Sequence, residues 1–159
     1  MNPKPTGHLD GNDLILTRTF RAPIEDVWAS VTKSESTARW FGSWEGDAGP
    51  GKTVRLQLLH EQGQPWASVT IEQCEPPRHL AVSTSDDAGV WRLELTLTET
   101  DGLTELRFVH HLSARELAGD TGPGWEYYLD MLVAAREGKP LPSFESYYPA
   151  QKAYYLEAK

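Results

Sequence analysis

Apolar and polar residues alternate along segments in the middle of the chain, which is typical of strands that bury one face. From Trp91 to Leu97 every second residue is apolar, and Arg92 and Glu94 are among the residues between them. A similar series runs through residues 106–112. These two segments are therefore predicted to be strands that each turn one apolar face toward a core.

Five such segments, together with a β-branched and aromatic stretch at residues 13–21, predict a sheet of about six strands. Short connections rich in Gly, Pro, Gln and Asp separate them, for example at 62–65 and 86–89. Parallel strands would need helical crossovers, so these connections favour an antiparallel meander. The five predicted strands are 53–60, 66–74, 80–84, 91–98 and 104–112.

Two short helices are expected directly after the first strand. Pro23, followed by Glu25 and Asp26, is typical of a helix start, because carboxylates near the N-terminus complement the helix dipole. Ser34 is the predicted N-cap of the second helix, and Gly42 ends it.

A long helix is expected near the C-terminus of the chain. Gly122 and Pro123 are predicted to open it, and Gly138 supplies the stop signal after Glu137. About 14 residues give a length of ~21 Å, enough to lie across a sheet. Its apolar stripe consists of Trp125, Leu129, Leu132 and Val133.

A chain of 159 residues is long enough for one domain with its own core. Residues 1–12 contain few apolar side chains and are predicted to form a flexible arm, with the folded domain at 13–142. Residues 143–159 form a tyrosine-rich tail in which Pro149 can start a last short helix. Closing a cavity, packing on the outside of the sheet and contacting a second copy are alternative roles for this tail.

The formal net charge of −8, without a basic stripe, argues against nucleic acid and anionic membrane surfaces as partners. Charged residues interrupt every apolar run, so insertion into a membrane is not expected. The chain has a single cysteine, Cys74, and its first residues lack the pattern of a signal peptide. These features favour a cytoplasmic protein.

Three separated motifs resemble the heat-shock-protein-90 ATPase activator homologue family, a branch of the START-like (SRPBCC) superfamily rich in bacterial members. The first is Phe-Arg-Ala-Pro-Ile-Glu-Asp-Val-Trp at 20–28, the second is Trp40-Phe41, and the third is Gly-Trp-Glu-Tyr-Tyr-Leu-Asp-Met-Leu at 124–132. The resemblance covers residues 13–142 in the family's order. It implies an α+β helix-grip fold, in which a curved antiparallel sheet wraps around a long C-terminal helix.

The resemblance also implies a cavity between sheet and helix, which in relatives holds a lipid, a polyketide or an aromatic compound. No cofactor is expected. Aromatic and aliphatic residues on the facing elements are the predicted lining, and membership of a closed core is the alternative for each of them. The predicted ligand-binding residues are Trp40, Phe41, Trp91, Phe108, His110, Trp125, Tyr128, Leu129 and Leu132.

Among the five histidines, His110 is the one candidate for proton transfer, because it shares the inward face of its strand with Phe108. A structural role and the orientation of a ligand's polar atom are its alternatives. His60 lies either at the cavity mouth or in solvent. The sequence contains no metal-binding signature such as HExxH or paired cysteines.

The sequence features and the family resemblance suggest three alternative functions. The first is binding or carriage of a small, largely apolar molecule. The second is an enzyme resembling polyketide cyclases and aromatases, with His110 moving protons. The third is a chaperone partner or other protein-interaction module, which the family name and the exposed-looking tyrosines suggest.

Overall fold

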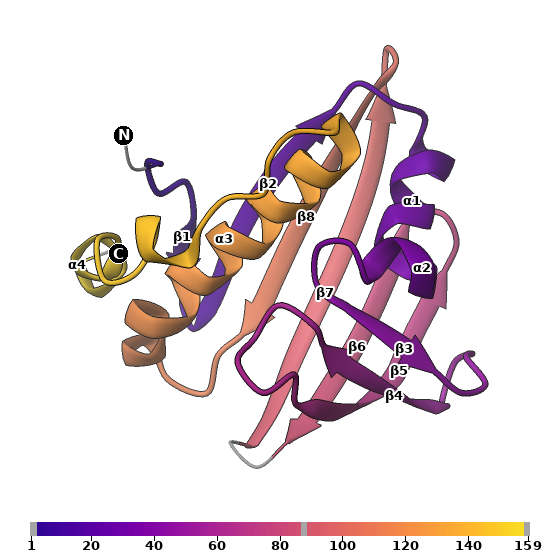
Figure 1. The fold of residues 1–159 in the computed structure, drawn as a ribbon, viewed down its shortest axis with the longest axis horizontal. Helices are drawn as coiled ribbons and strands as arrows, with labels where there is room; N and C mark the ends of the chain where they lie inside the picture. Colours follow the sequence, from indigo (N-terminus) through magenta and orange to yellow (C-terminus); the bar gives the residue numbers. More distant parts are fainter. Residues whose placement is uncertain (1–2, 87–88, 158–159) are drawn as a thin grey trace.

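The computed structural model describes residues 3–86 and 89–157, in which a long helix packs on one antiparallel sheet (Figure 1). Within these residues the sheet has eight strands in the order β1-β2-β8-β7-β6-β5-β4-β3. The strands are β1 His8–Asp10, β2 Asp13–Phe20, β3 Gly42–Glu45, β4 Thr53–Leu58, β5 Trp66–Glu75, β6 His79–Asp86, β7 Gly89–Thr100 and β8 Leu103–His111. The helices are α1 Ile24–Thr32, α2 Ser34–Thr37, α3 Ala118–Glu137 and α4 Lys152–Glu157, with single 3₁₀ turns at Arg115–Leu117 and Phe144–Ser146. This arrangement confirms the predicted helix-grip fold.

The prediction of about six strands was too low, because β1 and β3 were missed. β1 has three residues and β3 has four, which is too short for an alternating pattern to stand out. The predicted turn at 86–89 includes residues 87 and 88, which lie outside the described part of the chain.

The apolar faces of β7 and β8 lie on the same side of the sheet, as their alternation predicted. The register places Leu93 opposite His110 and Leu95 opposite Phe108. His111 therefore faces the other side of the sheet, because neighbouring strand residues point in opposite directions.

The sheet is strongly curved. Figure 1 shows β3 and β4 running across the direction of β7 and β8 rather than along it. The register of β5 against β6 shifts between Ile71 and Gln73, and such a β-bulge bends and twists a strand. A straight helix cannot fill the hollow of such a sheet along its whole length, so space is left beside α3.

Ser34 was predicted as the N-cap of α2, but it is the first residue of that helix, and Lys33 precedes it without a side-chain capping bond. The Ser34 hydroxyl instead donates to the Trp44 carbonyl oxygen and accepts from the Trp44 backbone N–H, both at 2.8 Å. This side chain therefore ties α2 to β3.

Helix α3 begins at Ala118, one turn before the predicted start, so that Pro123 lies inside it. Close packing of α4 accompanies the extension. A Cβ atom on Gly122 would approach the Tyr155 ring to 2.5 Å, and one on Gly119 would meet the Leu156 side chain at 2.8 Å. Tertiary contact thus outweighs the cost of an internal proline, whereas the end before Gly138 (φ 68°) agrees with the prediction.

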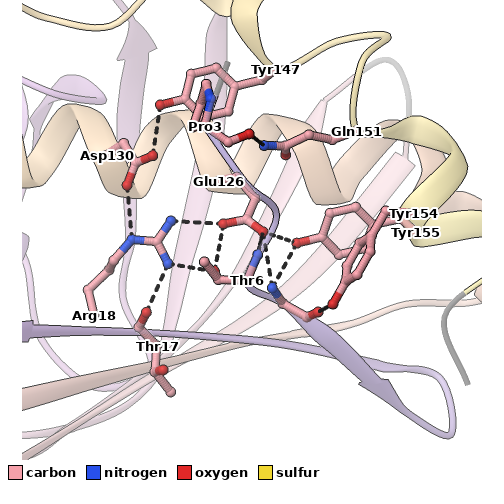
Figure 2. Close-up of polar contacts among 11 residues, drawn as sticks. Pro3, Thr6, Thr17, Arg18, Glu126, Asp130, Tyr147, Gln151, Tyr154 and Tyr155 are labelled. Atoms are coloured by element: carbon pink, nitrogen blue, oxygen red, sulfur yellow. Dashed lines mark hydrogen bonds and ion pairs between the residues drawn. The ribbon is translucent and has the colours of Figure 1, made fainter. Parts of the chain in front are cut away.

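The description of residues 1–12 as a flexible arm is corrected for residues 3–12. β1 pairs with β2, and the Gly7 backbone N–H donates to Glu126 at 3.0 Å. The tail lies beside this segment: the Gln151 amide donates to the Pro3 carbonyl oxygen, and the Tyr154 hydroxyl donates to that of Gly7 (Figure 2). The two ends of the described chain therefore hold each other on one end of α3.

At the centre of these contacts is a group that we call the terminal clasp, formed by Thr6, Arg18, Glu126, Asp130 and Tyr155 (Figure 2). The Arg18 guanidinium on β2 lies 2.8 Å from Glu126 and 3.0 Å from Asp130 on α3. Glu126 also accepts bonds from the Thr6 hydroxyl and the Tyr155 hydroxyl. Burial raises the pKa of Glu126, but hydrogen bonds from Tyr155, Arg18 and Thr6 outweigh it and lower that pKa below 4.5.

Candidate functional site

Two adjoining cavities lie between the sheet and α3. Both are partly open to solvent. The one that we call the inner cavity has a volume of about 300 Å³ and is walled by apolar side chains of α1, β4, β5, β6, β7, β8 and α3. The outer cavity has a volume of about 600 Å³ and lies between β4, the connection from β4 to β5, β7 and α3. Phe41 and Trp125 line both cavities and therefore stand at their boundary.

Aromatic rings hold this boundary in place. The Trp125 indole packs with its centroid 4.4 Å from that of Phe108 and 5.9 Å from that of Phe41. Phe41 in turn meets the Tyr128 ring edge to face at 4.9 Å, and Trp40 stacks on Phe41 at 5.5 Å. Such contacts add stabilisation beyond buried area, so these rings form a rigid wall rather than a loose filling.

The predicted lining residues divide between the cavities. The inner cavity is lined by Trp40, Phe41, Phe108, Trp125 and Leu129, and the outer cavity by Phe41, Trp91, Trp125 and Tyr128. Leu132 is buried in the core, 1% exposed, and lines neither cavity.

His110 also lines neither cavity, although it is buried with 3% exposure. Its Nδ1 accepts a hydrogen bond of 3.0 Å from the Trp125 indole N–H. Burial lowers the pKa of His110 to about 4, so the ring is neutral at physiological pH and Nδ1 is free to accept. His110 therefore orients Trp125 and does not face the space in which a ligand would react.

His110→Leu is expected to lower the free energy of unfolding by about 1–3 kcal/mol, because the buried Trp125 indole N–H loses its acceptor. Urea unfolding measures this loss, and the proton shift of the Trp125 indole reports the bond itself. His110→Asn, which offers an oxygen near the position of Nδ1, is the control. Its Trp125 indole proton should resonate closer to the position in the natural chain than that of His110→Leu. An indole shift unchanged in His110→Leu would contradict the assigned bond.

Several lining residues escaped the sequence prediction. Trp44 and Cys74 line the inner cavity, and Glu61 lines the outer one. Glu61 lies in the connection between β4 and β5, where nothing in the sequence shows which element the loop approaches. In the structure it accepts a 2.6 Å hydrogen bond from the Tyr128 hydroxyl. His60, for which mouth and solvent were both open, lines the outer cavity and donates to the Ala38 carbonyl oxygen.

One thiol, that of Cys74, lies in the wall of the inner cavity. Burial raises the pKa of the Cys74 thiol, which keeps it protonated and a weak nucleophile. No group of three or more metal-ligating side chains occurs among residues 3–86 and 89–157. In the same residues, no helix is long and apolar enough to span a membrane.

A second polar cluster lies on the opposite face of the sheet. The His111 ring nitrogens lie 2.7 Å from Asp13 and 2.6 Å from Glu94, which also bonds His79 at 2.9 Å. Carboxylates only accept, so both His111 nitrogens donate and the ring is a cation. Burial lowers the pKa of His111, but the bonds to Asp13 and Glu94 outweigh it and raise that pKa above 6.5.

The His111 cation should make stability depend on pH. A raised folded-state pKa stabilises the fold below the unfolded value of 6.5, and this contribution is lost as pH rises through the folded value. The unfolding free energy of the natural chain is therefore expected to fall relative to His111→Gln between neutral and mildly alkaline pH. Urea unfolding at a series of pH values measures the difference, and a difference that grows with pH would contradict it.

The sequence and fold are similar to those of known proteins. A family model described as Activator of Hsp90 ATPase homolog 1-like protein matches residues 21–137. The crystal structure of CalU16 from Micromonospora echinospora is 29% identical with a TM-score of 0.74, covering 92% of this chain and 89% of that chain. A solution structure from Bordetella parapertussis is 26% identical with a TM-score of 0.78, covering 99% and 94%.

A more distant structure shares the fold alone. DynU16, a protein of the dynemicin biosynthetic locus, is 21% identical with a TM-score of 0.70, covering 88% of this chain and 51% of that chain. No curated protein matches the sequence.

Proposed function

Because the chain belongs to the family of Activator of Hsp90 ATPase homolog 1-like proteins, we propose that it binds a small, largely apolar molecule in the two adjoining cavities. The observation that carries the proposal is the inner cavity, about 300 Å³ of space walled by apolar side chains. Close packing is the rule in protein interiors, and large well-formed apolar cavities are typical of ligand sites.

The size of the apolar surface supports a moderate affinity. Burying ~300 Å² of ligand surface at ~25 cal/mol per Å² gives ~7 kcal/mol before the costs of association. A lipid chain, a polyketide or an aromatic compound offers such surface.

The cyclase-like alternative has less support. Its candidate base, His110, is engaged with Trp125 and lies outside both cavity linings. The protein-interaction alternative has lost one of its two supports, the exposed tyrosines of the tail. Tyr147 and Tyr155 are buried and Tyr154 is exposed, so this alternative now rests mainly on the family name.

A two-dimensional amide NMR titration tests the proposal. Pools of fatty acids, long-chain amines, flavonoids and aromatic polyketides would be added to the pure protein. Saturable shifts that cluster on Phe108, Trp125 and Leu129 are expected, because these residues line the inner cavity. Shifts that are absent, or scattered over the surface, would overturn the proposal and direct the search to protein partners.

A further inference from the structure

The two cavities differ sharply in polarity. In the inner cavity the polar side chains without an aromatic ring are Thr32, Thr37, Thr84 and Cys74, none of them charged. The indole N–H groups of Trp40 and Trp44, which also line it, are already bonded to backbone carbonyl oxygens at 2.9 and 2.8 Å. The outer cavity, by contrast, adds charged and polar side chains to its aromatic rings and to the aliphatic residues Leu56, Leu58, Ala67 and Leu93. These polar side chains are His60, Glu61, Gln62, Thr84, Asp120 and Thr121. A ligand spanning both would therefore be apolar at one end and polar at the other.

The polar end of this site carries negative charge. Glu61 and Asp120 line the outer cavity, and none of its described lining residues is a lysine or an arginine. Asp120 is partly compensated by Lys152, whose ammonium lies 3.4 Å away. Glu61 is bonded to the neutral Tyr128 hydroxyl, which leaves the charge of its carboxylate in place. The formal net charge of −8 adds to the same sign of potential.

Glu61 is an exposed residue, and one of its carboxylate oxygens is anchored by a hydrogen bond. The hydroxyl of Tyr128, a residue 8% exposed, donates to Glu61 Oε2 at 2.6 Å across the outer cavity. Burial, together with the bond to Glu61, raises the pKa of Tyr128 far above its ordinary value of 10, so the hydroxyl remains a donor. A carboxylate has acceptor capacity on both oxygens, so Glu61 can bond Tyr128 and a ligand together.

We propose that the ligand is an amphiphile whose apolar body fills the inner cavity and whose protonated amine meets Glu61 in the outer cavity. This inference rests on the proposed function and narrows it to one ligand class. An amine gains both a charge-assisted hydrogen bond and the attraction of the surrounding carboxylates. A fatty-acid carboxylate of the same length would meet like charge and is disfavoured.

Three probes with one alkyl chain test the inference: decylamine, decanol and decanoate, each below its micelle concentration. Titration calorimetry at low salt should give the order amine, alcohol, carboxylate, with about tenfold or more between the first and last. Glu61→Gln should weaken decylamine about fivefold and leave decanol unchanged, because its amide keeps the bond from Tyr128 and loses only the charge. Glu45→Gln, which removes an exposed carboxylate on β3, is the matched control and should change none of the affinities.

The outcomes separate this inference from the proposed function. Equal binding of the three probes, or preference for decanoate, would overturn the amine assignment while leaving the apolar cavity as a binding site. No binding of any probe, with no amide shifts around Trp125, would overturn both. An equal loss of decanol and decylamine affinity in Glu61→Gln would show that Glu61 shapes the cavity and does not distinguish ligands by their charge. This result would also overturn the inference.

Discussion

Arg18→Met is expected to lower the free energy of unfolding by about 3–5 kcal/mol, the usual cost of stranding one partner of a buried ion pair. The reason lies in the terminal clasp, where the Glu126 side chain is 1% exposed and that of Arg18 is 11% exposed. Without the guanidinium, the carboxylate would remain buried with only neutral donors and the more distant charges of the fold. Urea unfolding followed by far-UV circular dichroism measures the loss.

The control for this prediction is Arg55→Met. Arg55 lies 3.6 Å from Glu45 on the surface, where the two side chains are 62% and 64% exposed, and its guanidinium also covers the Trp66 ring. Such exposed contacts contribute about 1 kcal/mol or less. Equal losses in the two variants would mean that the clasp stabilises no more than a surface pair.

The pH dependence gives the clasp a second signature. Because the folded-state pKa of Glu126 is lowered, its contribution is present above the unfolded value of 4.5 and is lost as pH falls through the folded value. The difference between the natural chain and Arg18→Met should therefore narrow as the pH is lowered toward and below 4.5. A difference that does not change with pH would contradict the assignment of Glu126 as the stranded charge.

The elements that the sequence predicted well are those whose signal is local. Alternation placed β7 and β8, and Gly138 marked the end of α3, because each pattern depends on neighbours along the chain. The inward position of Trp125 followed from the helical stripe in the same way. The family resemblance then supplied the order in which these elements pack.

What the sequence did not reveal depends on distant contacts. Glu126 is a polar residue between two aromatic ones in the sequence, and its burial depends on distant partners, among them Arg18, more than 100 positions away along the chain. β1 is a strand because β2 offers it an edge, not because three residues carry a pattern. The place of Glu61 depends on how the connection after β4 folds toward Tyr128. Long-range pairing decides all three.

Leu95→Trp is expected to weaken binding of decanol at least about tenfold, because the indole would occupy space that the ligand needs. Leu95 lies on β7 and lines the inner cavity of about 300 Å³, so a larger side chain has room there without displacing the wall. Thr98→Trp is the control, since Thr98 is an exposed residue of the same strand. Titration calorimetry on the three proteins measures the effect.

The stability of Leu95→Trp provides a second test, because it should not fall together with the affinity for decanol. Side chains around an empty cavity lack contacts on one side, so a tryptophan that fills it should leave the melting temperature unchanged or raise it. In a closed core the same substitution would cost about 1–3 kcal/mol through overpacking. Weaker decanol binding with undiminished stability is therefore expected only if the cavity is open and accepts a ligand. A Leu95→Trp protein that is destabilised and still binds decanol normally would refute the assignment of this cavity as the binding site.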